Sequence, residues 1–144
     1  MHNLTKMRIE KQTSEVFEAI VDPTKIGSFW FSSSSERWEQ GKTITLEYKE
    51  YNAIGTIAVL EIIDNQKIVY QWDPKEDGHI VTITFIAQSD KSTVVEVSEE
   101  GFNKEDPDFI SQLIGNKEGW VFMLTCLKGY LEFGVNKLRT GLTE

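Results

Sequence analysis

The middle of the chain, residues 44–100, alternates between apolar and polar side chains in short segments, and this pattern most constrains the fold. A period of two puts neighbouring side chains on opposite faces of a strand, so each segment predicts a strand with one buried and one wet face. Turns as short as Asp64-Asn65 and Asp77-Gly78 join the segments, which indicates antiparallel hairpins. The expected strands are residues 44–51, 53–63, 67–72, 80–87 and 93–100.

The spacing of apolar residues becomes helical between Lys117 and Leu138. The recurring residues are Trp120, Met123, Leu124, Leu127, Leu131 and Leu138. They form one broad apolar stripe on a helix about 30 Å long, at ~1.5 Å per residue. A helix with one apolar face needs a surface to cover, and the buried face of the sheet is the available one.

The first part of the chain predicts three short elements before the run of strands. Residues 4–11 alternate loosely and indicate a strand, and Val16, Phe17 and Ile20 then lie at helical spacing, with Thr13 or Ser14 as N-cap. Asp22-Pro23 restarts the chain as a second short helix. The expected fold is α+β and forms a single domain over residues 1–144. A curved antiparallel six-stranded sheet surrounds a long C-terminal helix, with two short helices between strands one and two.

Composition and charge exclude several classes of function. The chain of 144 residues has 15 Lys and Arg against 23 Asp and Glu, a net charge of −8, which repels phosphate backbones and anionic membrane surfaces. No apolar stretch approaches the ~18 residues that a membrane span needs, and the N-terminus has no signal peptide pattern. We therefore expect a cytoplasmic protein with no nucleic-acid partner and no membrane insertion. A single cysteine, Cys126, allows no intrachain disulfide.

Several segments, taken together, resemble a known superfamily. They include SEVFEAIVDPTKIGSFW at residues 14–30, GTIAVLEIIDNQKIVYQW at 55–72 and GWVFMLTCLKGYLEFG at 119–134. The chain resembles the START-like superfamily of helix-grip proteins, also called Bet v 1-like or SRPBCC, and within it the homologues of the activator of heat-shock-protein-90 ATPase. The resemblance implies a hydrophobic cavity between sheet and long helix, which binds apolar or amphipathic small molecules more often than it catalyses a reaction.

The aromatic residues suggest where such a cavity would lie. Four tryptophans are spread over four expected elements, and Trp and Tyr combine an apolar body with a hydrogen-bonding group, which suits an amphipathic ligand. We expect Trp120 at the floor, Trp30 and Trp38 at the mouth, and the serines at 32–35 as a mobile polar rim. The expected pocket residues are Trp30, Trp38, Tyr48, Trp72, Phe85, Trp120, Met123 and Leu124.

No catalytic residue, metal or cofactor is expected. The histidines, His2 and His79, are not placed to activate a serine, and no G-x-S-x-G motif or metal-ligand spacing occurs. Two alternatives to a binding protein stay open. One is a cyclase- or hydrolase-type enzyme on this fold that uses Tyr48 or His79 as acid or base. The other is a protein-interaction or co-chaperone-like domain, with a chaperone partner or a weak homodimer.

Overall fold

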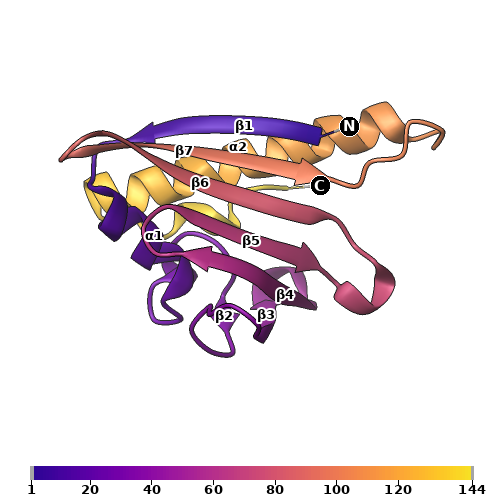
Figure 1. The fold of residues 1–144 in the computed structure, drawn as a ribbon, viewed down its shortest axis with the longest axis horizontal. Coiled ribbons are helices and arrows are strands. Elements are labelled where there is room, and N and C mark those ends of the chain that lie inside the picture. Colours follow the sequence, from indigo (N-terminus) through magenta and orange to yellow (C-terminus); the bar gives the residue numbers. More distant parts are fainter. Residues whose placement is uncertain (1, 144) are drawn as a thin grey trace.

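The structure is a computed structural model, and it describes residues 2–143. In this part of the chain seven strands form one antiparallel sheet in the order β1-β7-β6-β5-β4-β3-β2, and a long helix, α2, lies behind it along β1 and β7 (Figure 1). The elements are β1 (His2–Ile9), α1 (Thr13–Val21), β2 (Ser33–Ser34), β3 (Thr43–Tyr48), β4 (Ala53–Ile63), β5 (Lys67–Trp72), β6 (Ile80–Ser89), β7 (Ser92–Glu100) and α2 (Phe109–Phe133). Single 3₁₀ turns lie at 26–28, 49–51, 74–76 and 138–140.

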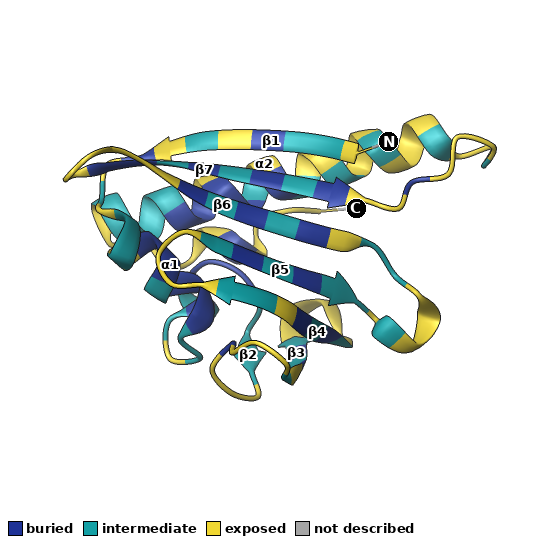
Figure 2. Ribbon diagram, in the orientation of Figure 1, coloured by how far each residue is buried: buried dark blue, intermediate teal, exposed yellow. Residues whose placement is uncertain are grey.

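The period-two pattern produces the expected sheet. Buried and partly exposed residues alternate along β6 and β7, as Figure 2 shows, so one face of these strands is covered. Polar contacts join α2 to the edge strand β1. Lys128 Nζ donates to the carbonyl of Arg8 at 2.7 Å, and Asn3 Nδ2 donates to the carbonyl of Leu113 at 2.8 Å. These contacts, near the two ends of β1, orient the helix along the strand.

The sheet has seven strands where six were expected, and the additional strand lies within the serine run. Ser33 pairs with Glu47 and Ser34 with Leu46, so β2 extends the sheet beyond β3. The Ser32 hydroxyl donates to the carbonyl of Glu47 at 2.8 Å and accepts from the amide of Lys49 at 2.9 Å. Ser32, Ser33 and Ser34 therefore lie at a hydrogen-bonded sheet edge, where the sequence predicted a mobile polar rim.

Both helical segments differ from the expected boundaries. The C-terminal helix begins at Phe109, earlier than expected, and continues through Gly115 and Gly119 to Phe133. It ends at Gly134, which has a left-handed conformation with φ of 70°. Leu138 therefore lies in a separate 3₁₀ turn. The second short helix is reduced to the 3₁₀ turn Ile26–Ser28, and the N-cap of α1 is Gln12.

Aromatic and aliphatic side chains pack closely in the buried core beneath α1. Phe17 of α1 meets Phe85 of β6 edge to face, with ring centroids 5.6 Å apart, and Trp38 meets Tyr70 of β5 at 5.3 Å. Val16, Ala19 and Ile20 on the same helix are completely buried. Close packing of this kind leaves little room among these buried side chains. A smaller pocket of about 350 Å³ is lined by Phe17, Trp38 and Ile62 together with charged and polar side chains.

Leu127 of α2 tests how strongly the helix stabilises the fold. Its side chain is fully buried, so Leu127→Ala removes apolar contacts and leaves a cavity, which should lower the free energy of unfolding by about 2–5 kcal/mol. Val121 lies on the same helix and is 40% exposed, so Val121→Ala should change stability by less than about 0.5 kcal/mol. Urea denaturation measures both, and equal stabilities would contradict the buried position of Leu127.

Ser32 and Ser33 form a matched pair for testing the serine run. Ser32→Ala removes both hydrogen bonds of the hydroxyl and leaves backbone groups of Glu47 and Lys49 without this partner, which should cost about 1–2 kcal/mol. Ser33 takes part in β2 through its backbone, so Ser33→Ala should have a smaller effect. Thermal unfolding of both variants makes the comparison, and a larger loss in Ser33→Ala would refute the role given to Ser32.

Candidate functional site

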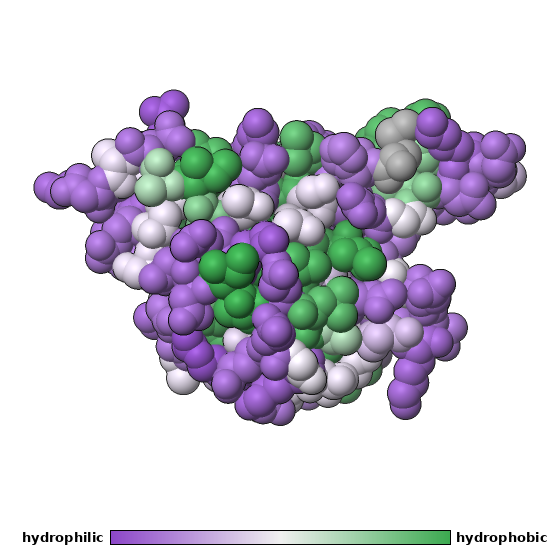
Figure 3. Space-filling view, viewed as in Figure 1, coloured by the Kyte–Doolittle hydropathy of each residue, from purple (hydrophilic) through white to green (hydrophobic). Residues whose placement is uncertain are grey.

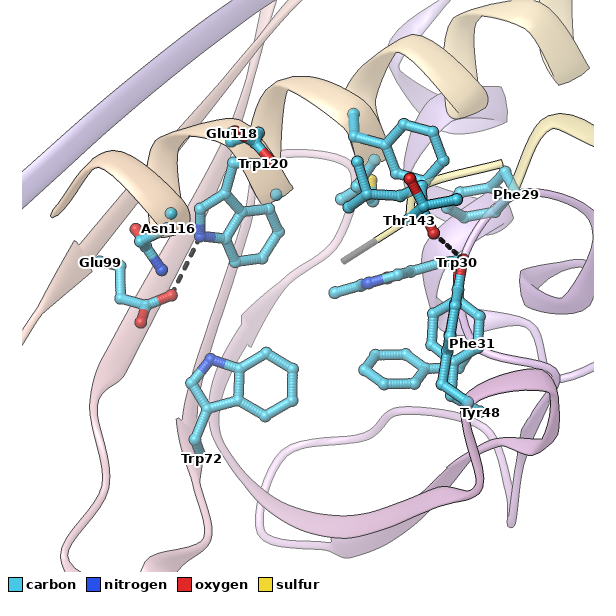
Figure 4. A pocket seen from close by; sticks show the side chains of 16 residues that line it. Phe29, Trp30, Phe31, Tyr48, Trp72, Glu99, Asn116, Glu118, Trp120 and Thr143 are labelled. Atoms are coloured by element: carbon cyan, nitrogen blue, oxygen red, sulfur yellow. Dashed lines mark hydrogen bonds between the residues drawn. The ribbon is translucent and has the colours of Figure 1, made fainter. Parts of the chain in front are cut away.

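A pocket of about 630 Å³ lies between α2 and the sheet, in the half of the interlayer space that α1 does not fill. Figure 4 shows its walls, with α2 on one side and strands of the sheet on the other. The lining side chains are largely aromatic. The pocket is lined by Phe29, Trp30, Phe31, Tyr48, Tyr51, Trp72, Glu99, Gly115, Asn116, Glu118, Gly119, Trp120, Phe122, Met123, Leu142 and Thr143.

Trp30 packs against several other aromatic rings at one end of the pocket. Its ring centroid lies 4.8 Å from Phe31, 5.5 Å from Trp120 and 6.4 Å from Trp72. Figure 4 shows Trp72 and Trp120 on opposite sides of an open space, with Trp30 at its far end. The three indoles come from β5, from α2 and from the loop before β2, so the tertiary fold assembles the wall from distant segments.

Glu99 supplies a carboxylate at the other end of the pocket. Val95 and Val97 face the core from β7, and the same alternation turns Glu99 inward, where it is only 5% exposed. Its Oε1 accepts a hydrogen bond from Trp120 Nε1 at 3.0 Å, and its Oε2 lies 2.8 Å from His79 Nδ1. The carboxylate is thus held in one orientation by Trp120 on α2 and by His79 just before β6.

The segment after α2 closes one wall of the pocket, and Arg139 holds it there. The guanidinium donates from Nε to the carbonyl of Trp30 at 2.7 Å and from both terminal nitrogens to Glu50 at 2.8 and 3.0 Å. It also lies over the ring of Tyr48, 4.8 Å from the centroid. Tyr51 donates from its hydroxyl to the carbonyl of Leu142 at 2.8 Å, so Leu142 reaches the pocket.

These contacts perturb several ionisable groups. The hydrogen bonds from Arg139 lower the pKa of Glu50 to about 2, and burial raises the pKa of Tyr48 to about 12. Tyr48 donates its hydroxyl proton to the carbonyl of Arg139, so the phenol is neutral and engaged near pH 7. Burial, with a smaller contribution from Glu99, raises the pKa of Tyr70 well above its usual value. Burial also raises the pKa of the Cys126 thiol, which makes it unreactive.

The structure brings together five of the residues named from the sequence. Trp30, Tyr48, Trp72, Trp120 and Met123 line the pocket. That they contact a ligand stays a prediction.

Three of the named residues lie outside this pocket. Phe85 packs against Phe17 beneath α1, Leu124 is completely buried in the core, and Trp38 is 1% exposed against Tyr70. Trp38 therefore does not lie at the pocket entrance, because its side chain packs against Tyr70 of β5. Trp30, at 8% exposure, forms an inner wall and not a rim.

Sequence reasoning missed other lining residues, and some had a detectable signal. Phe29 and Phe31 flank Trp30 in the sequence, and Glu99 follows Val95 and Val97 at the same parity, which identifies it as an inward-facing acid. Asn116 and Gly119 lie one turn before Trp120 and Met123 on the same helix. Tyr51 and Leu142 carried no such signal, because the tertiary fold alone brings the C-terminal segment to this wall.

Two further observations concern metals and membranes. Among residues 2–143, no group of three or more His, Cys, Asp or Glu side chains is placed to hold a metal ion. Within the same range no helix has the length and apolar character to cross a membrane.

The architecture and sequence match a known family. Residues 12–132 match the family model described as Activator of Hsp90 ATPase homolog 1-like protein. The chain belongs to this family. The match confirms the resemblance inferred from the sequence, including the START-like fold. No curated protein matches the chain significantly.

Solved structures share the fold over most of the chain. Protein SSP2350 from Staphylococcus saprophyticus is 52% identical, with a TM-score of 0.82 over 94% of this chain and 95% of that one. The Aha1 dimer from Colwellia psychrerythraea is 17% identical, with a TM-score of 0.78 over 93% and 98%. MLL2253 from Mesorhizobium loti is 20% identical, with a TM-score of 0.77 over 92% and 97%. The last two show the fold alone.

The pair of Glu50 and Arg139 predicts a pH dependence of stability. Glu50 has a pKa of about 2 in the folded protein against an ordinary value of 4.5, so its stabilising contribution is complete above about pH 4.5 and is lost as pH falls towards 2. Glu50→Gln should therefore lower the melting temperature most at neutral pH, and the difference from the unmodified protein should shrink between pH 4.5 and 2. Calorimetry across this range measures it.

Glu105→Gln, which changes an exposed glutamate before α2, serves as the control for the loss of one negative charge. Because the Glu50 side chain is 42% exposed, added salt should reduce the effect of Glu50→Gln. A melting-temperature difference that grows as pH falls would contradict the assigned ion pair.

Proposed function

We propose that the protein binds an apolar or amphipathic small molecule in the pocket between α2 and the sheet. The observation that carries the proposal is the difference in packing between the two halves of the space between the helices and the sheet. Buried side chains pack closely beneath α1, whereas about 630 Å³ remains open beside Trp30, Trp72 and Trp120. A volume of this size falls within the range of roughly 300–1,000 Å³ that is common for small-molecule sites.

The lining suits burial of an apolar body with a few fixed polar contacts. Aromatic side chains from four segments offer large rigid surfaces, and burial of apolar ligand area against them contributes roughly 25 cal/mol per Å². Glu99 and Asn116 are the polar side chains at one end of this surface. Binding that is driven by apolar contact should have a negative heat-capacity change.

An enzymatic function has less support from the geometry. The Tyr48 hydroxyl is bound to the carbonyl of Arg139, and its pKa of about 12 makes it a poor base at neutral pH. His79 pairs with Glu99 and is not one of the residues that line the pocket. Catalysis by either residue stays an untested alternative.

The protein-interaction alternative rests on other surfaces. Figure 3 shows apolar patches between hydrophilic side chains on the sheet side of the molecule. Ile110 and Ile114 of α2 are also 63% and 61% exposed, and their spacing of four puts them on one face of the helix. Nothing in the structure shows what would cover these side chains, so the pocket is the better supported site.

Gly119 offers a direct test, because it lines the pocket and has space around it. A Cβ at this position meets no heavy atom within 4 Å, so Gly119→Leu should fill part of the pocket without a clash. Leucine also favours a helix over glycine by about 0.8 kcal/mol, so the fold should be preserved or stabilised. We expect the affinity for the neutral fluorescent probe N-phenyl-1-naphthylamine to fall by roughly tenfold or more.

Val121→Leu is the matched control, since Val121 lies on the same helix and does not line the pocket. It should leave probe affinity unchanged in the same fluorescence titration. Equal affinities for Gly119→Leu and the unmodified protein would place the probe elsewhere and refute this site. No binding by the unmodified protein would refute the small-molecule function and leave the interaction domain as the better hypothesis.

A further inference from the structure

We infer that the pocket selects amphiphiles with a positively charged head, an amine or a quaternary ammonium group, which would lie against Glu99. This inference rests on the proposed function and specifies the ligand class for the same site. The geometry that points to it is a nearly buried carboxylate at one end of a pocket walled by indole rings. Both the carboxylate and the indole rings attract a cation, and no lysine or arginine is among the described lining residues.

Glu99 lacks a permanent cationic partner. Among residues 2–143, His79 is the only basic side chain within ion-pair distance of it, and an imidazole is a cation only when protonated. Its other partner, the Trp120 indole, is neutral. Burial of a carboxylate is costly unless a positive charge or several donors compensate it. A cationic ligand would supply that compensation on binding, so its affinity should exceed that of a neutral ligand of the same shape.

The aromatic wall favours the same charge. The faces of indole rings carry negative potential, and a cation within about 6 Å of a ring centroid is attracted to it. Trp72 and Trp120 face the open space near Glu99, as Figure 4 shows, with Trp30 beyond them. A head group beside Glu99 would therefore meet indoles as well as a carboxylate, while its apolar tail extends towards Phe29 and Phe31.

Anionic amphiphiles should be disfavoured for complementary reasons. Of the residues that the structure describes, no lysine or arginine lines the pocket, and a second acid, Glu118, does. Arg139 contacts Trp30 and Tyr48 but is not one of the lining residues, and Glu50 neutralises its charge. The net charge of −8 adds a long-range repulsion of anions that salt would screen. The lining therefore discriminates against fatty acids, although their tails match the apolar surface.

Three amphiphiles with the same ten-carbon tail length and different head groups test the inference on the unmodified protein. Decyltrimethylammonium, decanol and decanoate are titrated below their micelle concentrations, with displacement of N-phenyl-1-naphthylamine as the readout. We expect decyltrimethylammonium to bind about tenfold tighter than decanol, and decanoate to bind most weakly. Equal or tighter binding of decanol or decanoate overturns the inference. If the probe binds but decanol or decanoate binds as tightly as decyltrimethylammonium, the proposed function stands and the inference fails. If neither the probe nor any amphiphile binds, the proposed function and the inference both fail.

Glu99→Gln identifies the group responsible. Glutamine retains an oxygen that can accept from Trp120 but loses the charge, so the preference for decyltrimethylammonium over decanol should fall to about threefold or less, with decanol affinity little changed. Glu100→Gln is the matched control. Glu100 is the exposed neighbour of Glu99 on β7, and its substitution removes the same net charge. It should retain the full preference. A preference that survives in folded Glu99→Gln, checked by circular dichroism, would overturn the role of Glu99. If that variant does not fold, the head-group series on the unmodified protein decides.

Discussion

The packing of α2 against the buried face of the sheet is the contact on which the other features depend. Trp120, Met123, Leu124 and Leu127 are buried on this helix, and polar contacts near both ends of β1 fix its direction. A single helix is about 10 Å wide and cannot cover a sheet of seven strands. Additional segments must therefore cover the remaining apolar face, and their unequal coverage creates the pocket.

Coverage is closer where α1 lies and incomplete beside residues 115–123, in the middle of α2. Phe17 and Trp38 fill the space over Phe85 and Tyr70, whereas two glycines, Gly115 and Gly119, present no side chain to the opposite half. The indole rings of Trp30, Trp72 and Trp120 line this space but do not fill it. The pocket thus follows from side-chain size on α2 as much as from the curvature of the sheet.

The C-terminal segment and Glu99 determine the character of the pocket. Arg139 joins the segment to Glu50 and to the backbone of Trp30, which places Leu142 in the wall and positions the Trp30 indole. Glu99 is oriented by Trp120 and His79, so the polar end of the pocket is held in place as well. Rigid groups lose little conformational entropy when a ligand binds, which favours affinity for a ligand of matching shape and charge.

The sequence by itself determined the order of the main elements, because period-two and period-3.6 patterns report directly on which residues are buried. It determined the antiparallel hairpins and the long final helix, and Glu99 shares the inward parity of Val95 and Val97 on β7. Tertiary structure alone decided the seventh strand, since two serines carry no apolar pattern and pair through their backbones with β3. It also decided that Phe85 and Trp38 fill the core while Trp72 faces a pocket. All three are inward aromatic residues, and the segments packed against them, such as α1 over Phe85, distinguish them.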